Sequence, residues 1–280
     1  MSQSDFERKI LRDNKSGSSE ILNSVLNYNL EYLSEKHLDS ESLGYLLHFN
    51  KTVEKKFSAM AIVTNGLNKA NRIILELNCD KIPVTKIARK LALLIKDIVS
   101  IDKKVINNSS VLFPKTTDKI AVVTYSNSGL VKQVITSFRE KISKIYMSEA
   151  RPANEGRDMA QYFADIGIEV VFSVDSLLPG LLSKANLLIL GADSIGQEKF
   201  INKIGSGVLL ESARRLGVKS AILFESLKIK KLNLDTLLKN DYSSREIWPL
   251  GHPENITVIN QYFEIIDNSL RSEERRVGKE

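Results

Sequence analysis

The stretch KIAVVTYSNSG, residues 119–129, passes from a short apolar run into small polar residues. Ile120 to Tyr125 is rich in β-branched residues, which is typical of a strand, and Ser126 to Gly129 suits a turn into a helix. The same change of character recurs further along the chain. The predicted strands are Ile120 to Tyr125, Lys144 to Met147, Glu169 to Val174, Leu187 to Leu190, Ser220 to Phe224 and Ile256 to Ile259.

Short helical stretches separate these strands, and strands that alternate with helices require crossover connections, which give a mostly parallel sheet covered on both faces. The predicted fold class is therefore α/β. We expect an amino-terminal helical domain at residues 1–112, followed by a Rossmann-like, mostly parallel, doubly wound sheet at residues 113–270. Residues 271–280, RSEERRVGKE, look like a translated adapter and are predicted to be a non-native tail.

The helical domain is predicted from apolar residues that recur at three- and four-residue steps. Ser4 and Glu7 have the spacing of a capping box at the start of a first helix. Turn residues at 107–110, followed by Pro114, end the helical pattern and place the boundary near residue 112. The apolar stripes run from Ile21 to Leu33, from Phe57 to Leu67 and from Ile87 to Ile98.

The composition limits the class of protein. The chain has 280 residues, 42% of them hydrophobic, and its single cysteine, Cys79, permits no internal disulfide. A charged amino terminus and the lack of a long apolar run lead us to expect a cytoplasmic protein with no membrane partner. The net charge of +6 comes from lysines interleaved with acidic residues, which disfavours an RNA-binding role.

Polar residues follow each predicted strand at its carboxyl end, the edge where open parallel sheets bind ligands. Any single one, such as Ser126 or Asp175, could instead cap the following helix. Because six strand ends contribute, the set as a whole favours a ligand pocket. Its members are Thr124, Ser126, Asn127, Ser128 and Gly129, then Glu149, Arg151 and Pro152, then Asp175, then Gly191, Ala192 and Asp193, then Glu225, Ser226 and Lys228, and finally Asn260 and Glu264.

The segment Asn202-Lys203-Ile204-Gly205-Ser206-Gly207 precedes a predicted helix. Its small residues allow backbone N–H groups to approach an anion, and the helix start favours negative charge, so phosphate is the expected guest. The segment has neither a Walker pattern nor a GxGxxG fingerprint, which disfavours nucleotide hydrolysis and NAD chemistry. The sequence has no metal-ligand spacing and no GxSxG motif, so we expect no metal site, no cofactor and no serine hydrolase chemistry.

In these motifs the chain resembles the family that joins the alpha, beta and delta subunits of translation initiation factor 2B to ribose 1,5-bisphosphate isomerase and methylthioribose-1-phosphate isomerase. The resemblance implies a pocket that is catalytic in some members and regulatory in others. It also implies a homodimer or higher oligomer and allows a translation-factor partner. The motifs are Glu149-Ala150-Arg151-Pro152 with Gly156-Arg157, Asp175-Ser176, Gly191-Ala192-Asp193, Asn202-Lys203-Ile204-Gly205 and Glu225-Ser226-Leu227-Lys228, with Asp13 and Ser16-Gly17-Ser18 on an early helix and Ser58-Ala59-Met60-Ala61 on a later one.

The resemblance implies roles for individual residues. The isomerases shuttle protons with an aspartate, which Asp193 matches, and with a cysteine, where this chain has Ser126. A thiol has a pKa near ~8.5 and an aliphatic hydroxyl is a far weaker acid, so this replacement should cost orders of magnitude in isomerase rate. The candidate catalytic residues are therefore Asp193 and Ser126, and the candidate ligand- or phosphate-binding residues are Arg151, Asn202, Lys203, Gly205 and Lys228.

The balance of features favours a non-catalytic member of that family. The cysteine is replaced, the Arg-Gly-Ala loop with which the isomerases hold phosphate is absent, and the pair Ser126 and Ser128 resembles the regulatory subunits. We expect a regulatory protein that binds a phosphorylated sugar or a nucleoside monophosphate at the carboxyl ends of the sheet. The alternative is an aldose–ketose isomerase of the ribose 1,5-bisphosphate or methylthioribose 1-phosphate type, in which Asp193 and a water transfer the protons.

Overall fold

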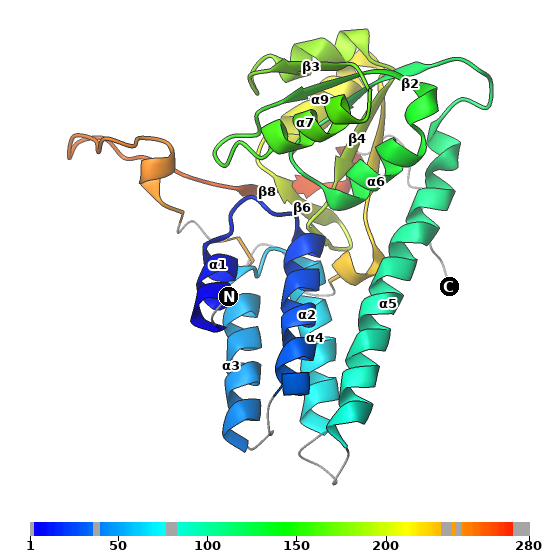
Figure 1. Ribbon diagram of the computed structural model, residues 1–280. Coiled ribbons are helices and arrows are strands. Elements are labelled where there is room, and N and C mark those ends of the chain that lie inside the picture. The colour runs from blue at the N-terminus through cyan, green and yellow to red at the C-terminus, as the bar shows by residue number, and fades with distance from the viewer. Residues whose placement is uncertain (1–2, 36–39, 77–82, 231–236, 239–241, 271–280) are drawn as a thin grey trace.

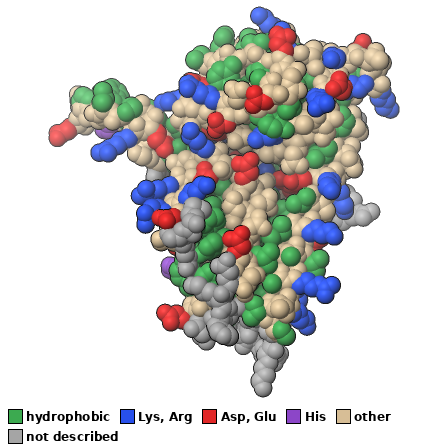
Figure 2. Space-filling view, in the orientation of Figure 1, with side chains coloured by type: hydrophobic (Ala, Val, Ile, Leu, Met, Phe, Trp, Pro, Cys, Tyr) green, Lys and Arg blue, Asp and Glu red, His purple; other side chains and the backbone are tan. Residues whose placement is uncertain are grey.

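The computed structural model describes residues 3–35, 40–76, 83–230, 237–238 and 242–270. Cys79 and the predicted tail at residues 271–280 lie outside these ranges. The chain has a helical part followed by a sheet part, and the sheet part sits on one end of the helices (Figure 1). Basic and acidic side chains are intermixed over the face in Figure 2.

The helical part is an antiparallel bundle of long helices. Its helices are α1 (Gln3–Arg12), α2 (Ser18–Glu35), α3 (Ser40–Lys56), α4 (Ala61–Leu75) and α5 (Val84–Asn108). The apolar stripes of α2, α4 and α5 face one another, and Leu26, Leu67 and Leu91 are fully buried. Gly66 lets α2 approach α4 closely, because a Cβ there would lie 2.5 Å from the Leu22 side chain. No described helix is both long and apolar enough to cross a membrane.

Two details of the predicted helices are wrong. Helix α1 begins at Gln3, so Ser4 lies inside it and does not cap it. The apolar stripe from Phe57 to Leu67 is not one helix, since α3 ends at Lys56 and α4 begins at Ala61. At this break the sheet part forms hydrogen bonds with the backbone that joins the two helices. The Ala61 N–H donates to the Asp193 carbonyl at 2.8 Å, and the Ser194 hydroxyl donates to the Ala59 carbonyl at 2.6 Å.

The main sheet has five parallel strands in the order β3-β2-β1-β4-β7. Alternate residues of β1 and β4 point to opposite faces, and both faces are buried: Val122 and Ile189 pack with α6 and α7, whereas Val123 and Leu188 pack with α8 and α9. This confirms the doubly wound α/β fold. The elements are β1 (Ile120–Thr124), α6 (Gly129–Ser137), β2 (Ile142–Ser148), α7 (Gly156–Asp165), β3 (Val170–Ser173), α8 (Leu178–Leu181), β4 (Leu187–Gly191), α9 (Ser206–Leu216) and β7 (Lys219–Leu223).

The sixth predicted strand is wrong. Residues Ile256 to Ile259 form no strand and lie on a segment that projects from the body of the molecule, orange in Figure 1, where Ile259 is 76% exposed. The strand β8 (Phe263–Asp267) follows later and pairs antiparallel with β6 (Lys199–Lys203), which in turn pairs with β5 (Ser194–Ile195). A β-branched run becomes a strand only where a neighbouring backbone pairs with it, and the body of the molecule offers none at residues 256–259.

Candidate functional site

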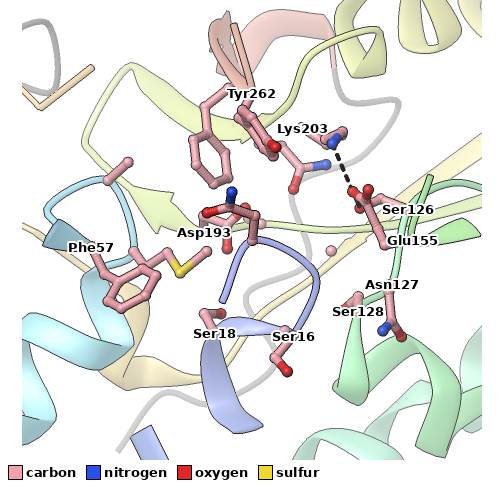
Figure 3. A pocket seen from close by; sticks show the side chains of 18 of the residues that line it. Ser16, Ser18, Phe57, Ser126, Asn127, Ser128, Glu155, Asp193, Lys203 and Tyr262 are labelled. Atoms are coloured by element: carbon pink, nitrogen blue, oxygen red, sulfur yellow. Dashed lines mark hydrogen bonds and ion pairs between the residues drawn. The ribbon is translucent and has the colours of Figure 1, made fainter. Parts of the chain in front are cut away.

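A cavity lies where the helical part meets the carboxyl ends of β1 and β4 and the small antiparallel sheet (Figure 3). Its water-accessible volume is about 80 Å³. One water needs roughly 10–15 Å³ by this measure, so the cavity has room for a small polar ligand. The polar residues that line it include Asp13, Ser16, Ser18, Ser126, Asn127, Ser128, Glu155, Asp193, Asn202, Lys203 and Lys228.

The first wall comes from the loop between α1 and α2. The Asp13 carboxylate accepts the backbone N–H groups of Lys15 and Ser16 at 3.0 and 2.8 Å, which fixes the turn that leads into α2. Ser16 and Gly17 therefore lie in this loop rather than on a helix, and Ser18 is the first residue of α2. The sequence pattern singled out these residues but did not place them in the pocket.

The second wall contains Ser126, Glu155 and Lys203. Ser126 has a left-handed backbone, with φ of 65°, and its hydroxyl donates to Glu155 Oε1 at 2.8 Å. Lys203 Nζ lies 2.8 Å from the same oxygen, and both side chains of this ion pair are less than 10% exposed. A buried ion pair of this kind needs further hydrogen bonds to offset its desolvation. Glu155 was not among the predicted site residues.

Beneath the cavity, Lys228 is surrounded by carboxylates. Its Nζ lies 3.0 Å from Glu225 Oε2, and Glu225 also accepts a hydrogen bond from the Ser19 hydroxyl at 3.1 Å. Although burial alone would lower it, the charges of Glu225 and Asp193 hold the pKa of Lys228 above its ordinary value. Lys228 is thus a cation whose charge is already matched by the protein, with Asp102 on α5 nearby.

Asp193 borders the cavity directly after β4. Burial raises its pKa to about 6, although Lys228 and a hydrogen bond with Ser18 act in the opposite direction. A carboxyl group with a pKa near 6 exists in both protonation states close to neutral pH. Asp193 can therefore give or take a proton, and it is held in place from the helical part by Ser18.

The remaining wall of the cavity is largely apolar. Tyr242 and Tyr262 contact each other with ring centroids 4.1 Å apart, and Lys203 Nζ lies 4.7 Å from the centre of the Tyr262 ring. The Tyr262 hydroxyl donates to Glu246 at 2.7 Å, which fixes that ring. Apolar side chains of Phe57, Met60, Leu237 and Phe263 line the same cavity. A ligand with one polar and one apolar side fits such walls.

Not every predicted site residue reaches the cavity. Ser126, Asp193, Asn202, Lys203 and Lys228 line it, whereas Arg151 and Gly205 do not. The Arg151 guanidinium is exposed and donates to the Glu246 carbonyl at 3.2 Å. The Asn202 side-chain amide donates a hydrogen bond to the Ser206 hydroxyl at 2.9 Å.

The predicted phosphate position at the start of α9 is already occupied by the protein. The Gly207 N–H donates to Glu264 Oε1 at 2.8 Å, so an internal carboxylate takes the place that the sequence suggested for an anion. Gly205 is required for a different reason: its backbone is left-handed, with φ of 99°, and a Cβ there would lie 3.1 Å from the Tyr125 hydroxyl. The Gly207 N–H is therefore not free for an external anion, and phosphate binding by this segment stays a prediction.

Asp175 and Ser128 have structural roles of the kind that a polar strand end allows. Asp175 accepts hydrogen bonds from the Ser148 hydroxyl and from the N–H groups of Ala150 and Arg151 at 2.6 to 2.9 Å. Ser128 is the N-cap of α6 and accepts from the Val131 N–H. Over the described residues, no group of three or more histidine, cysteine, aspartate or glutamate side chains could hold a metal ion.

The family to which the chain belongs follows from a match to the initiation factor 2 subunit family over residues 8–270. This chain is a member of that family. It is 27% identical over 137 residues to ribose 1,5-bisphosphate isomerase of Archaeoglobus fulgidus, covering 47% of this chain and 44% of that protein. It is 34% identical over 92 residues to ribose 1,5-bisphosphate isomerase of Methanocaldococcus jannaschii, covering 32% and 30%. These matches span less than half the length of the two curated relatives.

Solved structures of the same fold cover almost the whole chain. The initiation factor 2B structure from Pyrococcus horikoshii superposes with a TM-score of 0.76 at 20% identity, over 97% of this chain and 94% of that one. The 5-methylthioribose 1-phosphate isomerase from the same organism superposes with a TM-score of 0.77 at 17% identity, over 96% and 81%. Both confirm the arrangement of helical part and sheet.

Proposed function

We propose that this member of the initiation factor 2 subunit family binds a small phosphorylated sugar or a nucleoside monophosphate in the cavity and does not turn it over. The observation that carries the proposal is that one cavity collects the starts of two helices, α2 and α6. Lys203 and Lys228 also line it, although each is paired with a glutamate. Helix starts present free N–H groups and partial positive charge, which suit a phosphate.

The state of Ser126 supports binding without turnover. Its hydroxyl is committed to Glu155, and no thiol lines the cavity among the described residues, Cys79 being outside them. Isomerisation between neighbouring sugar carbons needs two groups that exchange protons near neutral pH, and a serine hydroxyl does not. Asp193, with a pKa of about 6, can supply one of these two groups.

Isothermal calorimetry with ribose 5-phosphate, ribose 1,5-bisphosphate and AMP tests the proposal on the 280-residue chain. We expect saturable binding of at least one, and at least about tenfold weaker binding by Ser16→Phe, which fills the cavity. Ser137→Phe, on the exposed side of α6, is the matched control and should bind as wild type does. No binding by the wild-type chain would contradict the proposal.

The second candidate function is an aldose–ketose isomerase, which the pKa of Asp193 near 6 favours. In this mechanism Asp193 would take a proton from one sugar carbon and return it to the next, with a water assisting. Coupled assays with ribose 1,5-bisphosphate and methylthioribose 1-phosphate decide between the two functions. Turnover that Asp193→Asn abolishes would establish the isomerase, and turnover that this variant leaves unchanged would exclude the mechanism.

A further inference from the structure

Helix α5 carries much of the positive charge of the chain. It contains six basic and two acidic residues, a net charge of +4, whereas the whole protein has +6. Of the two acids, Asp97 is exposed, but Asp102 is half-buried and accepts a hydrogen bond from Gln133 on α6 at 3.3 Å. Basic and acidic residues that are interleaved in the sequence are thus separated by the helix, and its outer face is basic.

Five of the six basic side chains lie on this outer face. The sixth, Lys90, pairs with Glu76. The five are exposed, and none forms an ion pair with any residue that the structure describes. Three of them follow one another at seven-residue steps and so lie in one line about 21 Å long. Figure 2 shows Lys and Arg side chains in file along the edge of the molecule that α5 forms in Figure 1. We call these five residues the α5 row: Lys86, Arg89, Lys96, Lys103 and Lys104.

The α5 row does not serve the stability of its own helix. Lys86 lies in the first turn, where the helix dipole disfavours a cation, and the last turn, where a cation would be favourable, has no basic residue. Two apolar side chains, Leu93 and Val99, are 51% and 45% exposed on the same side of the helix. A negatively charged partner outside the chain would account for the position of these cations.

The shape of this face selects among such partners. The inner side of α5 is buried in the bundle through Ile87, Leu91, Leu94 and Ile98, so only one side of the helix is accessible. A helix held in this way cannot enter the major groove of B-DNA, which takes up a whole helix. Double-stranded RNA instead has a wide, shallow minor groove bordered by phosphates, along which a line of cations can lie.

We propose that the α5 row binds the phosphate backbone of double-stranded RNA. The sequence argument against RNA depended on interleaved charges, and the helix separates those charges. Contacts with phosphates carry no base sequence, so the binding is independent of sequence. None of the five residues lines the cavity, and this inference therefore goes beyond the proposed function and does not depend on it.

Fluorescence anisotropy with a labelled RNA duplex of about 16 base pairs and the 280-residue chain tests the inference. We expect a dissociation constant between about 1 and 100 µM at physiological salt. Affinity should fall about hundredfold between about 50 and 200 mM salt, because four or so phosphate contacts release their counterions. A DNA duplex of the same sequence should bind at least about fivefold more weakly, since its minor groove is narrow.

A triple variant locates the contact. Arg89→Gln, Lys96→Gln and Lys103→Gln together should weaken RNA binding at least about tenfold and make the salt dependence shallower by about two to three in log–log slope. Binding of AMP should stay as in wild type, because the α5 row lies outside the cavity.

A matched control removes the same charge elsewhere. Lys9→Gln, Lys184→Gln and Arg215→Gln also replace one arginine and two lysines at exposed positions. Lys9 is on α1, at the opposite edge of the bundle from α5 (Figure 1), and the other two lie with α8 and α9 on the other face of the main sheet. This control should bind RNA within about twofold of wild type.

Each other outcome would overturn the inference: no RNA binding at about 50 mM salt, equal affinity in the α5 row variant and the control, or DNA bound as tightly as RNA. Poly-L-glutamate that binds as tightly as RNA, and is weakened by the same variant, would identify an acidic protein as the partner and show that RNA is wrong. If circular dichroism shows that the triple variant does not fold, Lys96→Gln alone replaces it. The log–log slope should then become shallower by about one, and an unchanged slope would contradict the inference.

Discussion

At the scale of single residues, Asp193 joins the two parts of the molecule. Its carbonyl accepts a hydrogen bond from the Ala61 N–H at the start of α4, and its carboxyl group is hydrogen-bonded to Ser18 at the start of α2. The same carboxyl group borders the cavity, where burial raises its pKa to about 6. Its protonation state therefore affects both the charge of the cavity wall and the stability of the fold.

We predict that the free energy of unfolding decreases as the pH rises from about 4 to 6. In this range the folded protein keeps a proton on Asp193, whose pKa is about 6, while the unfolded chain with its ordinary pKa of 3.8 releases it. Burial raises the pKa of Asp102 to about 6 as well, with Glu225 adding to the effect, so it contributes a slope of the same sign.

Asp193→Asn should remove part of this slope and be more stable than wild type by about 1 to 3 kcal/mol at pH 8, since the buried charge is gone. Urea unfolding at pH values from 4.5 to 8 measures this. Asp165→Asn, on the exposed side of α7, is the control and should follow the wild-type curve. An unchanged slope in Asp193→Asn would refute the assignment.

At the scale of elements, the loop after β2 depends on one carboxylate. Ala150 has a left-handed backbone, with φ of 59°, and Asp175 after β3 holds this turn by accepting three hydrogen bonds. The turn leads into α7 and sets the position of Glu155 immediately before that helix. Asp175 thus acts on the cavity from outside it.

We predict that Asp175→Ala lowers the free energy of unfolding by about 2 to 4 kcal/mol, because it leaves two backbone N–H groups and a buried hydroxyl without their acceptor. Chemical denaturation measures the change. Glu198→Ala, at an exposed position, should stay within about 0.5 kcal/mol of wild type. An equally small effect for Asp175→Ala would show that the turn is held in another way.

The five strands of the main sheet could be predicted from the sequence because each contains a short apolar run, and in the central strands both faces are buried, as Val122 and Val123 on β1 are. The small antiparallel sheet could not. Its strands β6 and β8 contain Asn202, Lys203 and Glu264, which break the apolar pattern because they serve the cavity and the cap of α9. Residues Ile256 to Ile259 were wrongly predicted as a strand for the opposite reason: they have the β-branched pattern of a strand but no strand pairs with them.

The candidate site could be predicted in part. Ser126 and Asp193 follow β1 and β4 closely, and Lys228 lies in the loop after β7, and the carboxyl ends of parallel strands converge at one edge. Asn202 and Lys203 end β6 of the antiparallel sheet and were singled out by the motif instead. Glu155 and Tyr262 could not be found this way, since tertiary packing alone brings them to the wall. Their only sequence signal is position: Glu155 lies four residues beyond Arg151 in a motif already singled out.

At the scale of the whole molecule, the helical and sheet parts are joined by buried hydrogen bonds. Ser194 is fully buried, donates to the Ala59 carbonyl and accepts the Ala61 N–H at 3.1 Å. Asn65 on α4 donates to the carbonyls of Leu227 and Ile229 at 2.7 and 3.1 Å. The cavity lies directly beside this junction, since Ala59, Met60 and Asp193 line it. The hydrogen bonds of the junction therefore also hold this part of the cavity wall in place.

We predict that Ser194→Ala costs about 1 to 3 kcal/mol and weakens ligand binding together with stability, because the turn at residues 57–60 loses its anchor. Thermal unfolding with and without AMP measures both effects. Ser137→Ala, exposed on α6, is the control and should change neither. Ser194→Ala with wild-type affinity and lowered stability would show that the junction supports the fold alone.

The cavity is assembled from residues that are far apart in the order of synthesis: Asp13 to Ser19, Phe57 to Met60, then Tyr125 onwards as far as Phe263. On a ribosome the helical part is exposed long before the last wall has been made. A ligand of the proposed kind therefore has no complete place to bind until Phe263 has emerged. Added during translation, such a ligand should protect against proteolysis only those chains in which Phe263 is already free to fold.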